Sequence, residues 1–183
     1  MIEMTVLRTT IFVAWVVFWV SWLLAAAAVK PGSRRPGRGA PGLLVLLVVF
    51  GAARGLRLGD ATVHSVPLAA LGTVLFFAGL GLAVWARLHL GRNWGMPMTT
   101  KDEPELVTSG PYRLVRHPIY SGVLLAMLGT ALATSLYALV AFLALSAYFI
   151  YCALVEERLM SREFPNAYPS YRARTKMLVP FVL

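Results

Sequence analysis

The feature that most constrains this chain is a set of long apolar runs that carry no charged residue. The first run, Thr9 to Val29, has 21 residues. At a rise of about 1.5 Å per residue such a helix crosses a hydrocarbon core of about 30 Å, and it exceeds the roughly 7 to 15 residues of a signal-peptide core. The runs are continuous and not alternating, which favours helices over the strands of a membrane barrel. The sequence therefore predicts an all-α integral membrane protein.

Four more apolar runs bring the expected number of transmembrane helices to about five. They are Gly42 to Ala53, Val66 to Ala86, Ile119 to Thr134 and Leu136 to Val155. The first of these has only 12 residues, so it either crosses with Arg54 and Arg57 reaching the interface or forms a re-entrant segment. The last two are separated only by Ser135, which predicts a tight antiparallel hairpin. We expect a single domain over 1–183, with N-terminal membrane helices over 1–86 and a cofactor-binding half over 87–183.

The basic residues predict the orientation of these helices. The formal net charge is +9, but the basic residues lie between apolar runs, so we expect no nucleic-acid partner. If all five runs cross, 14 Lys and Arg residues lie on one face and 3 on the other. The positive-inside rule then places the loop 87–118 and the tail after 155 in the cytoplasm. This predicts a multi-pass protein of the cell (inner) membrane. If the second run is re-entrant instead, the loop 87–118 and the tail after 155 still face the cytoplasm together.

The predicted hairpin brings two charged pairs to one depth. Pro118 suits the first position of the fourth helix, where its missing N–H is not needed, and this puts Arg116 and His117 at the mouth of that helix. The fifth helix is expected to end over Val155 to Leu159, so Glu156 and Glu157 would lie against its unfavourable dipole end. Either an interfacial ion pair with Arg116 or Arg158 explains them fully, or one carboxylate pairs with Arg116 while the other helps to hold a cationic cofactor.

Other patterns carry weaker signals. Aromatic and basic residues alternate in the tail, where they form either an interfacial belt or the wall of a site. The stripe Gly122, Ala126 and Thr130 favours helix packing over a substrate tunnel. Neither a glycine-rich nucleotide-binding turn nor a metal-spaced histidine pair is present, and Cys152 is the single cysteine. We therefore expect no metal.

Several motifs occur in a fixed order in the C-terminal half. They are Gly110-Pro111-Tyr112, Arg116-His117-Pro118-x-Tyr120-x-Gly122, Glu156-Glu157-x-Leu159, Tyr168-x-x-Tyr171 and Pro180-Phe181. Over roughly residues 85 to 183 this set resembles the isoprenylcysteine carboxyl methyltransferase family. Phospholipid N-methyltransferases, methanethiol S-methyltransferases and the C-terminal halves of membrane sterol reductases are similar in the same region.

The resemblance implies a methyltransferase that uses S-adenosylmethionine, bound in a pocket formed by the hairpin with the cytoplasmic loop and tail. The implied cofactor-binding residues are Gly110, Pro111, Tyr112, Arg116, His117, Pro118, Tyr120, Glu156 and Glu157. For catalysis we expect Arg174, with Arg172 as second choice, to face an anionic acceptor. Glu156 and Glu157 would contact polar groups of the cofactor or acceptor, or act as base for a thiol or amine.

The expected acceptor is a small or lipophilic carboxylate, thiol or amine that enters from the membrane lipid. The chain is shorter in its N-terminal half than the eukaryotic carboxyl methyltransferases, which argues against a prenylcysteine acceptor. Two other classes stay open, namely a sterol-reductase-like oxidoreductase that uses NADPH and a non-catalytic membrane scaffold. The sequence predicts neither the identity of the acceptor nor the oligomeric state.

Overall fold

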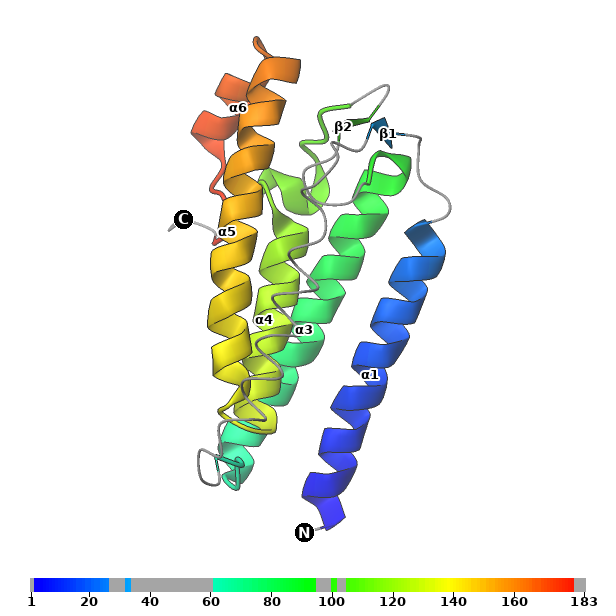
Figure 1. The fold of residues 1–183 in the computed structure, drawn as a ribbon, viewed down its shortest axis with the longest axis vertical. Helices are drawn as coiled ribbons and strands as arrows, with labels where there is room; N and C mark the ends of the chain where they lie inside the picture. The colour runs from blue at the N-terminus through cyan, green and yellow to red at the C-terminus, as the bar shows by residue number, and fades with distance from the viewer. Residues whose placement is uncertain (1, 27–31, 34–60, 95–99, 102–104, 180–183) are drawn as a thin grey trace.

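The computed structural model describes residues 2–26, 32–33, 61–94, 100–101 and 105–179. These residues form a bundle of long, roughly aligned helices with smaller elements gathered at one end (Figure 1). The predicted segment Gly42 to Ala53, its flanking arginines Arg54 and Arg57, and the Pro180-Phe181 motif lie outside the described residues.

Four long helices make up most of the described chain. They are α1 (Ile2–Ala26), α3 (Val66–Leu90), α4 (Pro118–Ala133) and α5 (Ala138–Glu163). The smaller elements are the antiparallel strands β1 (Gly32–Ser33) and β2 (Thr100–Lys101), the 3-10 helices η1 (Gly91–Asn93) and η2 (Gly110–Arg113), and the helix α6 (Tyr168–Arg174).

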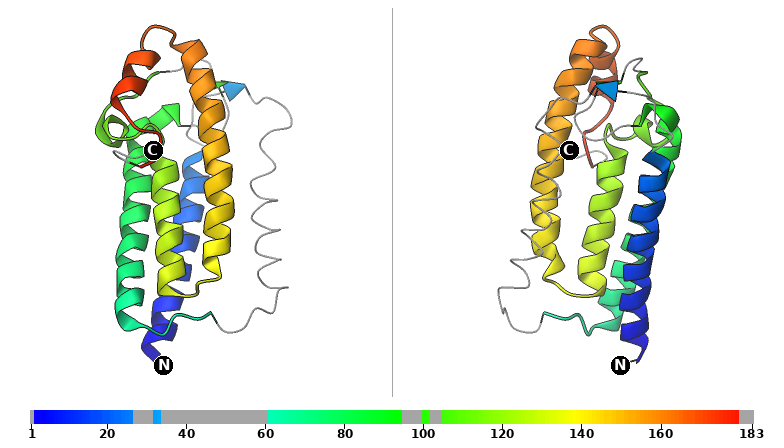
Figure 2. Two further views of the ribbon diagram at one scale, coloured as in Figure 1. Left: turned by 90° about the vertical axis from the view of Figure 1, so that its left-hand side faces the viewer. Right: turned by 45° about the vertical axis from the view of Figure 1, so that its right-hand side comes forward.

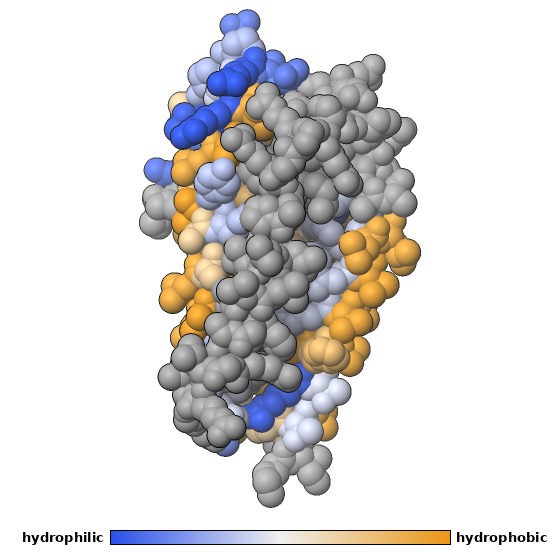
Figure 3. All heavy atoms as spheres, viewed as in Figure 1, coloured by the Kyte–Doolittle hydropathy of each residue, from blue (hydrophilic) through white to orange (hydrophobic). Residues whose placement is uncertain are grey.

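The composition of the helices fits a membrane. Among the described residues, α1, α3 and α5 are long and apolar enough to cross a bilayer, and α4 is a shorter apolar helix of 16 residues. Large side chains such as Phe12, Leu24 and Leu143 are exposed on their outer faces. In Figure 3 hydrophobic residues line both flanks of the bundle, and hydrophilic residues gather at the end that carries α6. The predicted all-α membrane class is confirmed.

The prediction that the fifth helix ends over Val155 to Leu159 was wrong. The helix α5 continues to Glu163, because the residues after the apolar run favour helix and the first stop signal is Phe164-Pro165. Glu156 and Glu157 therefore lie inside the helix and not in its last turn. The unfavourable dipole at the C-terminal end of a helix therefore does not act on these two carboxylates as the sequence predicted.

The small residues of α4 bring its backbone against that of α3. A Cβ atom added to Gly122 would lie 2.6 Å from the backbone nitrogen of Ala83 and 2.6 Å from the carbonyl oxygen of Gly79. Ala126 is also fully buried. The packing interpretation of the small-residue stripe is thus confirmed for Gly122 and Ala126. Thr130 differs, because its hydroxyl oxygen accepts a hydrogen bond of 3.0 Å from Nε1 of Trp15 on α1.

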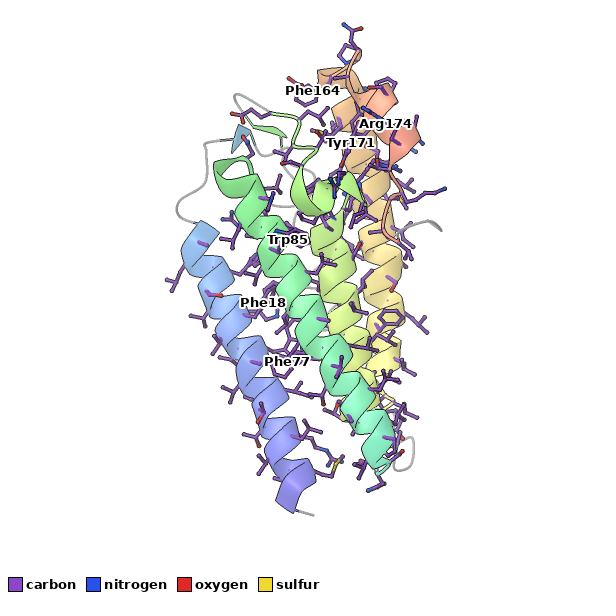
Figure 4. The ribbon with its side chains drawn as sticks, turned by 180° about the vertical axis from the view of Figure 1, so that it is seen from behind. Phe18, Phe77, Trp85, Phe164, Tyr171 and Arg174 are labelled. Carbon is purple, nitrogen blue, oxygen red and sulfur yellow. The ribbon has the colours of Figure 1, made fainter. Side chains whose placement is uncertain are left out.

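An aromatic face attaches α1 to this pair. Trp15 packs edge-on against Phe76 of α3, with ring centroids 5.6 Å apart. Phe18 is buried in a cluster with Ala83 and Val123, and Figure 4 shows its side chain between α1 and α3. The result is a bundle in which α3 and α4 form the core and α1 covers one side.

The end of the bundle is closed by the returning tail. After α6 the chain runs parallel to the residues before α4, with a bridge between Val115 and Lys176. The backbone N–H of Arg116 donates to the carbonyl of Lys176 at 2.8 Å, and that of His117 donates to Met177 at 3.1 Å. Both views of Figure 2 place α6 over the end of the bundle at which α4 begins and α5 ends. This closure holds the loop and tail motifs against each other.

Candidate functional site

The site lies where the hairpin of α4 and α5 opens. Pro118 is the first residue of α4, as predicted, and His117 precedes it as the N-cap residue. The turn at the opposite end is tight, since α4 ends at Ala133 and α5 begins at Ala138. Because the two helices are antiparallel, the residues before α4 lie at the depth of the last third of α5.

Glu157 is held between two arginines. Its Oε1 accepts a hydrogen bond of 2.6 Å from Nε of Arg116, and only 5% and 10% of the two side chains are exposed. On the other side, Nε of Arg172 lies 3.4 Å from Oε2. Arg116 also donates from Nη1 to the carbonyl oxygens of Thr175 and Arg172. The arginine thereby joins the hairpin to α6 and the tail.

Glu156 makes a second, more accessible pair. The hydroxyl of Tyr120 donates to its Oε1 at 2.6 Å, and Nδ1 of His117 lies 3.3 Å from its Oε2. About a quarter of the Glu156 side chain is exposed, at 24%. These distances confirm that the basic pair before α4 meets the acidic pair of α5. They also confirm that one carboxylate pairs with Arg116.

His117 is a buried ring with one nitrogen that lacks a hydrogen bond. Its Nε2 is buried without a hydrogen-bond partner, and Oε1 of Glu157 lies 3.7 Å from it. The ring stacks on Tyr120, whose own ring stacks on Phe149 of α5. Burial disfavours the imidazolium form, but the carboxylates of Glu156 and Glu157 outweigh that effect and raise the pKa of His117 above its ordinary value.

Three tyrosines form the wall behind this cluster. Tyr112, Tyr168 and Tyr171 are all buried, and the hydroxyl of Tyr171 donates to the carbonyl oxygen of Tyr112 at 2.7 Å. Burial raises the pKa of Tyr171 to about 12, and it raises the pKa of Tyr112 and Tyr168 as well. These phenols are neutral at physiological pH, so they offer aromatic surface and hydroxyl groups rather than charge.

The turn before Tyr112 requires glycine at position 110. Gly110 has a φ of +57°, and a Cβ atom there would overlap the imidazole of His89. Pro111 is fully buried. This turn directs Tyr112 into the wall, which explains why the motif Gly110-Pro111-Tyr112 occurs where it does.

The two arginines predicted for the acceptor lie in different surroundings. Arg172 contacts Glu157 at the edge of the cluster, although 59% of its side chain is exposed. Arg174 is exposed, and its Nε donates to the carbonyl oxygen of Ser170 within α6 (Figure 4). The structure therefore brings Arg172 to the cluster and leaves Arg174 outside it.

One charged residue near the site was treated in the sequence only as a positive-inside charge. The guanidinium of Arg87 lies 4.3 Å from the ring centroid of Trp94 and 6.0 Å from that of Trp22. It donates to the carbonyl oxygens of Ala25 and Gly91 at 3.0 and 2.8 Å. The nearby tryptophans were the available signal, since Arg favours aromatic faces. Arg87 thereby links the C-terminal end of α1 to the C-terminal end of α3.

The described part of the chain holds no group of three or more His, Cys, Asp or Glu side chains that could bind a metal ion. The charged cluster instead combines carboxylates, guanidinium groups, an imidazole and tyrosines. Such a set can bind the charged and hydroxyl groups of a polar organic molecule.

Comparison with known proteins identifies the family of this chain. A family model described as phospholipid methyltransferase matches residues 68–167, more than half of the 183 residues. The fold and the cluster define a helical membrane protein with a polar site at one end of the bundle. The chain belongs to the phospholipid methyltransferase family, as the resemblance to membrane methyltransferases in its motifs predicted.

Three curated relatives match part of the chain. It is 36% identical over 104 residues to the cobalt-zinc-cadmium resistance protein CzcN of Cupriavidus metallidurans, covering 55% of this chain and 48% of the relative. It is 35% identical over 94 residues to the nickel-cobalt-cadmium resistance protein NccN of Alcaligenes xylosoxydans xylosoxydans, covering 50% and 44%. It is 44% identical over 69 residues to methanethiol S-methyltransferase 2 of Bradyrhizobium diazoefficiens, covering 38% and 26%. The matches thus span half or less of each relative.

Proposed function

We propose that this protein is a membrane-embedded methyltransferase that takes its methyl group from S-adenosylmethionine. Family membership supports the reaction class. The observation that carries the proposal is the meeting of Arg116 and His117 with Glu156 and Glu157 at the open end of the hairpin. It provides charged and aromatic groups that suit a ligand bearing both positive and negative charge.

The residues present fit S-adenosylmethionine. The ligand carries a sulfonium, an ammonium, a carboxylate and ribose hydroxyl groups. Glu156 is partly exposed and suits an ammonium or a hydroxyl group, and the buried Nε2 of His117 has no hydrogen-bond partner. The ring of Tyr120 already stacks on His117 and Phe149, so Tyr112 in the wall is the aromatic group proposed to contact a sulfonium or an adenine. When bound, the cofactor supplies an electrophilic methyl group on sulfur.

In this proposal the protein's own residues position the reactants and exclude water. Glu157 is committed to Arg116 and Arg172, so it fixes the geometry of the cluster. Glu156 is the more accessible of the two carboxylates, and we assign contact with the ligand to it. Holding two reactants in line contributes roughly 7 to 11 kcal/mol to such a reaction, and an anionic acceptor needs no base.

The acceptor is proposed as a small or lipophilic molecule that reaches the site from the bilayer. The likeness to methanethiol S-methyltransferase 2 favours a thiol among the candidate groups. A thiol requires deprotonation, for which Glu156 is the candidate base. Arg172, beside Glu157, is better placed than Arg174 for an anionic acceptor, because Arg174 lies outside the cluster.

Calorimetric titration of the purified protein in detergent tests the cofactor. We expect saturable binding of S-adenosylmethionine and S-adenosylhomocysteine, and no tight binding of NADPH. Glu156→Gln should weaken binding of both by about tenfold, the effect of roughly one lost charge-assisted hydrogen bond. Tight binding of NADPH alone would contradict the proposal and point to an oxidoreductase, and binding of none of the three would contradict it in favour of a non-catalytic scaffold.

The acceptor class can be tested separately by mass spectrometry. The protein is incubated with S-adenosylmethionine carrying a labelled methyl group, together with membrane lipid extract or with a panel of alkyl thiols, amines and carboxylates. We expect label in at least one lipophilic or small compound, and more in thiols than in amines. Label in none of them, from a protein that binds the cofactor, would contradict the proposed reaction.

A further inference from the structure

A surface pocket of about 240 Å³ lies on the outer side of the charged cluster, between α5 and α6. It is lined by Leu154, Glu157, Arg158, Ser161 and Arg172. Two guanidinium groups therefore face the same hollow from two elements. The pocket is open to the surface, so a bound group can extend out of it.

The positive charge of the pocket exceeds what its own carboxylate neutralises. Glu157 is already paired with Arg116, which lies on its inner side. Arg172 contacts Glu157 only through Nε, and its side chain is mostly exposed. Within the ranges that the structure describes, Arg158 makes no ion pair or side-chain hydrogen bond. Ser161 donates to the carbonyl oxygen of Glu157, so the two arginines are the available donors.

The pocket also lies at the end of an apolar stripe. Leu143, Tyr151 and Leu154 are exposed on α5 by 64%, 50% and 43%. Their spacing places them on one face of the helix, and Arg158 follows on that same face one turn after Leu154. One turn is about 5.4 Å. A molecule with a long apolar chain on the stripe would therefore bring a headgroup to Arg158.

We propose that this pocket binds the phosphate of an anionic glycerophospholipid of the surrounding membrane. The phosphate contacts Arg158 and Arg172, and an acyl chain lies along Leu154 and Tyr151. Arginine suits this ligand because its planar group donates two parallel hydrogen bonds to phosphate. Basic pockets at the membrane surface bind anionic lipid headgroups in the same way. The pocket shares Glu157 and Arg172 with the candidate site and adds Arg158 and Leu154, and the lipid proposal stands even if the proposed reaction is wrong.

The test measures lipid retention. Purified protein in detergent is titrated with phosphatidylglycerol or with phosphatidylcholine, and bound lipid is counted by native mass spectrometry. We expect preferential retention of phosphatidylglycerol. Arg158→Gln should reduce it by about fivefold, the effect of losing about 1 kcal/mol of attraction. Arg158→Lys should lose less, because the charge is retained.

The matched control is Arg162→Gln, which removes an equal charge from the same helix but not from the pocket. It should reduce retention of phosphatidylglycerol by less than about twofold. Equal losses in the two variants would overturn the site in favour of diffuse attraction. An unchanged Arg158→Gln variant, or displacement of the lipid by millimolar inorganic phosphate, would overturn it too. Thermal unfolding of each variant establishes that it is folded.

Discussion

At the scale of single residues, Glu157 is the centre of the charged cluster. Its carboxylate is buried and is shared by Arg116 and Arg172. Removing one partner of a buried ion pair leaves the other charge uncompensated, which costs about 3 to 5 kcal/mol. Glu157→Gln should therefore lower the free energy of unfolding in detergent by that amount. Glu163→Gln, at the exposed end of α5, should change it by less than about 0.5 kcal/mol.

His117 is expected to make the stability of the protein fall as the pH rises. Its pKa is raised by Glu156 and Glu157 despite burial, so the folded state binds the proton more tightly than the unfolded state does. This stabilisation is complete below the ordinary histidine pKa of about 6.5 and is lost as the pH rises through the folded pKa. Unfolding midpoints from pH 6 to 9 should fall in the wild type. His117→Gln should remove this part of the dependence.

The control for this measurement is His89→Gln, which removes an exposed histidine at the end of α3. Its midpoints should fall with pH as those of the wild type do. If His117→Gln falls equally, the pH dependence arises elsewhere, and the assignment to His117 is wrong.

Much of this cluster could be predicted from the sequence because few charged residues have to share a small polar region. The hairpin fixes the depth of Arg116 and Glu157, and burial forces them to pair. The carbonyl acceptors of Arg116 at Thr175 and Arg172 were not predictable. They depend on the path of the tail after α6, which is set by tertiary packing and not by periodicity.

At the scale of elements, the contact between α3 and α4 depends on residues without side chains. A Cβ atom at Gly79 would overlap the backbone of Gly122 and Ala126, whereas one at Gly81 on the same helix would meet no atom within 4 Å. Gly79→Ala should destabilise the protein by about 1 to 3 kcal/mol through overpacking. Gly81→Ala should leave stability unchanged or slightly raised, since alanine favours helix. Unfolding in detergent distinguishes them, and equal effects would contradict the close packing.

A buried hydrogen bond from Tyr171 helps to hold the helix α6 to the loop, beside the contacts of Arg116. Tyr171→Phe removes the donor to the carbonyl oxygen of Tyr112 and leaves a buried acceptor unpaired, at a cost of about 1 to 3 kcal/mol. Opening of the tail should become more frequent, which hydrogen exchange of residues 168–178 would detect. The hydroxyl of Tyr151 is the matched control, because that residue is half exposed on α5. Equal exchange in Tyr171→Phe and Tyr151→Phe would contradict the role of this bond.

The sequence predicted which helices exist better than where they end. The apolar runs of α3 and α5 mark the lengths that lie in lipid, but both helices continue beyond them, to Leu90 and Glu163. A helix ends where its backbone meets a stop signal, whereas an apolar run ends where the solvent changes. Since those two boundaries are independent, hydropathy alone could not place Glu156 and Glu157 in the interior of α5.

At the scale of the whole molecule, charge is distributed unevenly between the two ends. Of the eleven Lys and Arg residues that the structure describes, ten lie at the end with the site, five between 87 and 118 and five after 155. Arg8 lies toward the opposite end, where it reaches the carbonyl oxygen of Val63. The same end carries the candidate site, the lipid pocket and the polar surface of Figure 3. A single orientation in the membrane would therefore serve all three features.

This asymmetry predicts that the site faces the cytoplasm. Cys152 is fully buried, so it contributes little labelling, and a new cysteine can report on either end. Ser170→Cys on α6 should react with a membrane-impermeant maleimide in inside-out vesicles but not in intact cells. Ser65→Cys, before α3 at the other end, should show the reverse pattern. If Ser170→Cys reacts in intact cells, the orientation is inverted, and a cofactor made in the cytoplasm could not reach the cluster directly.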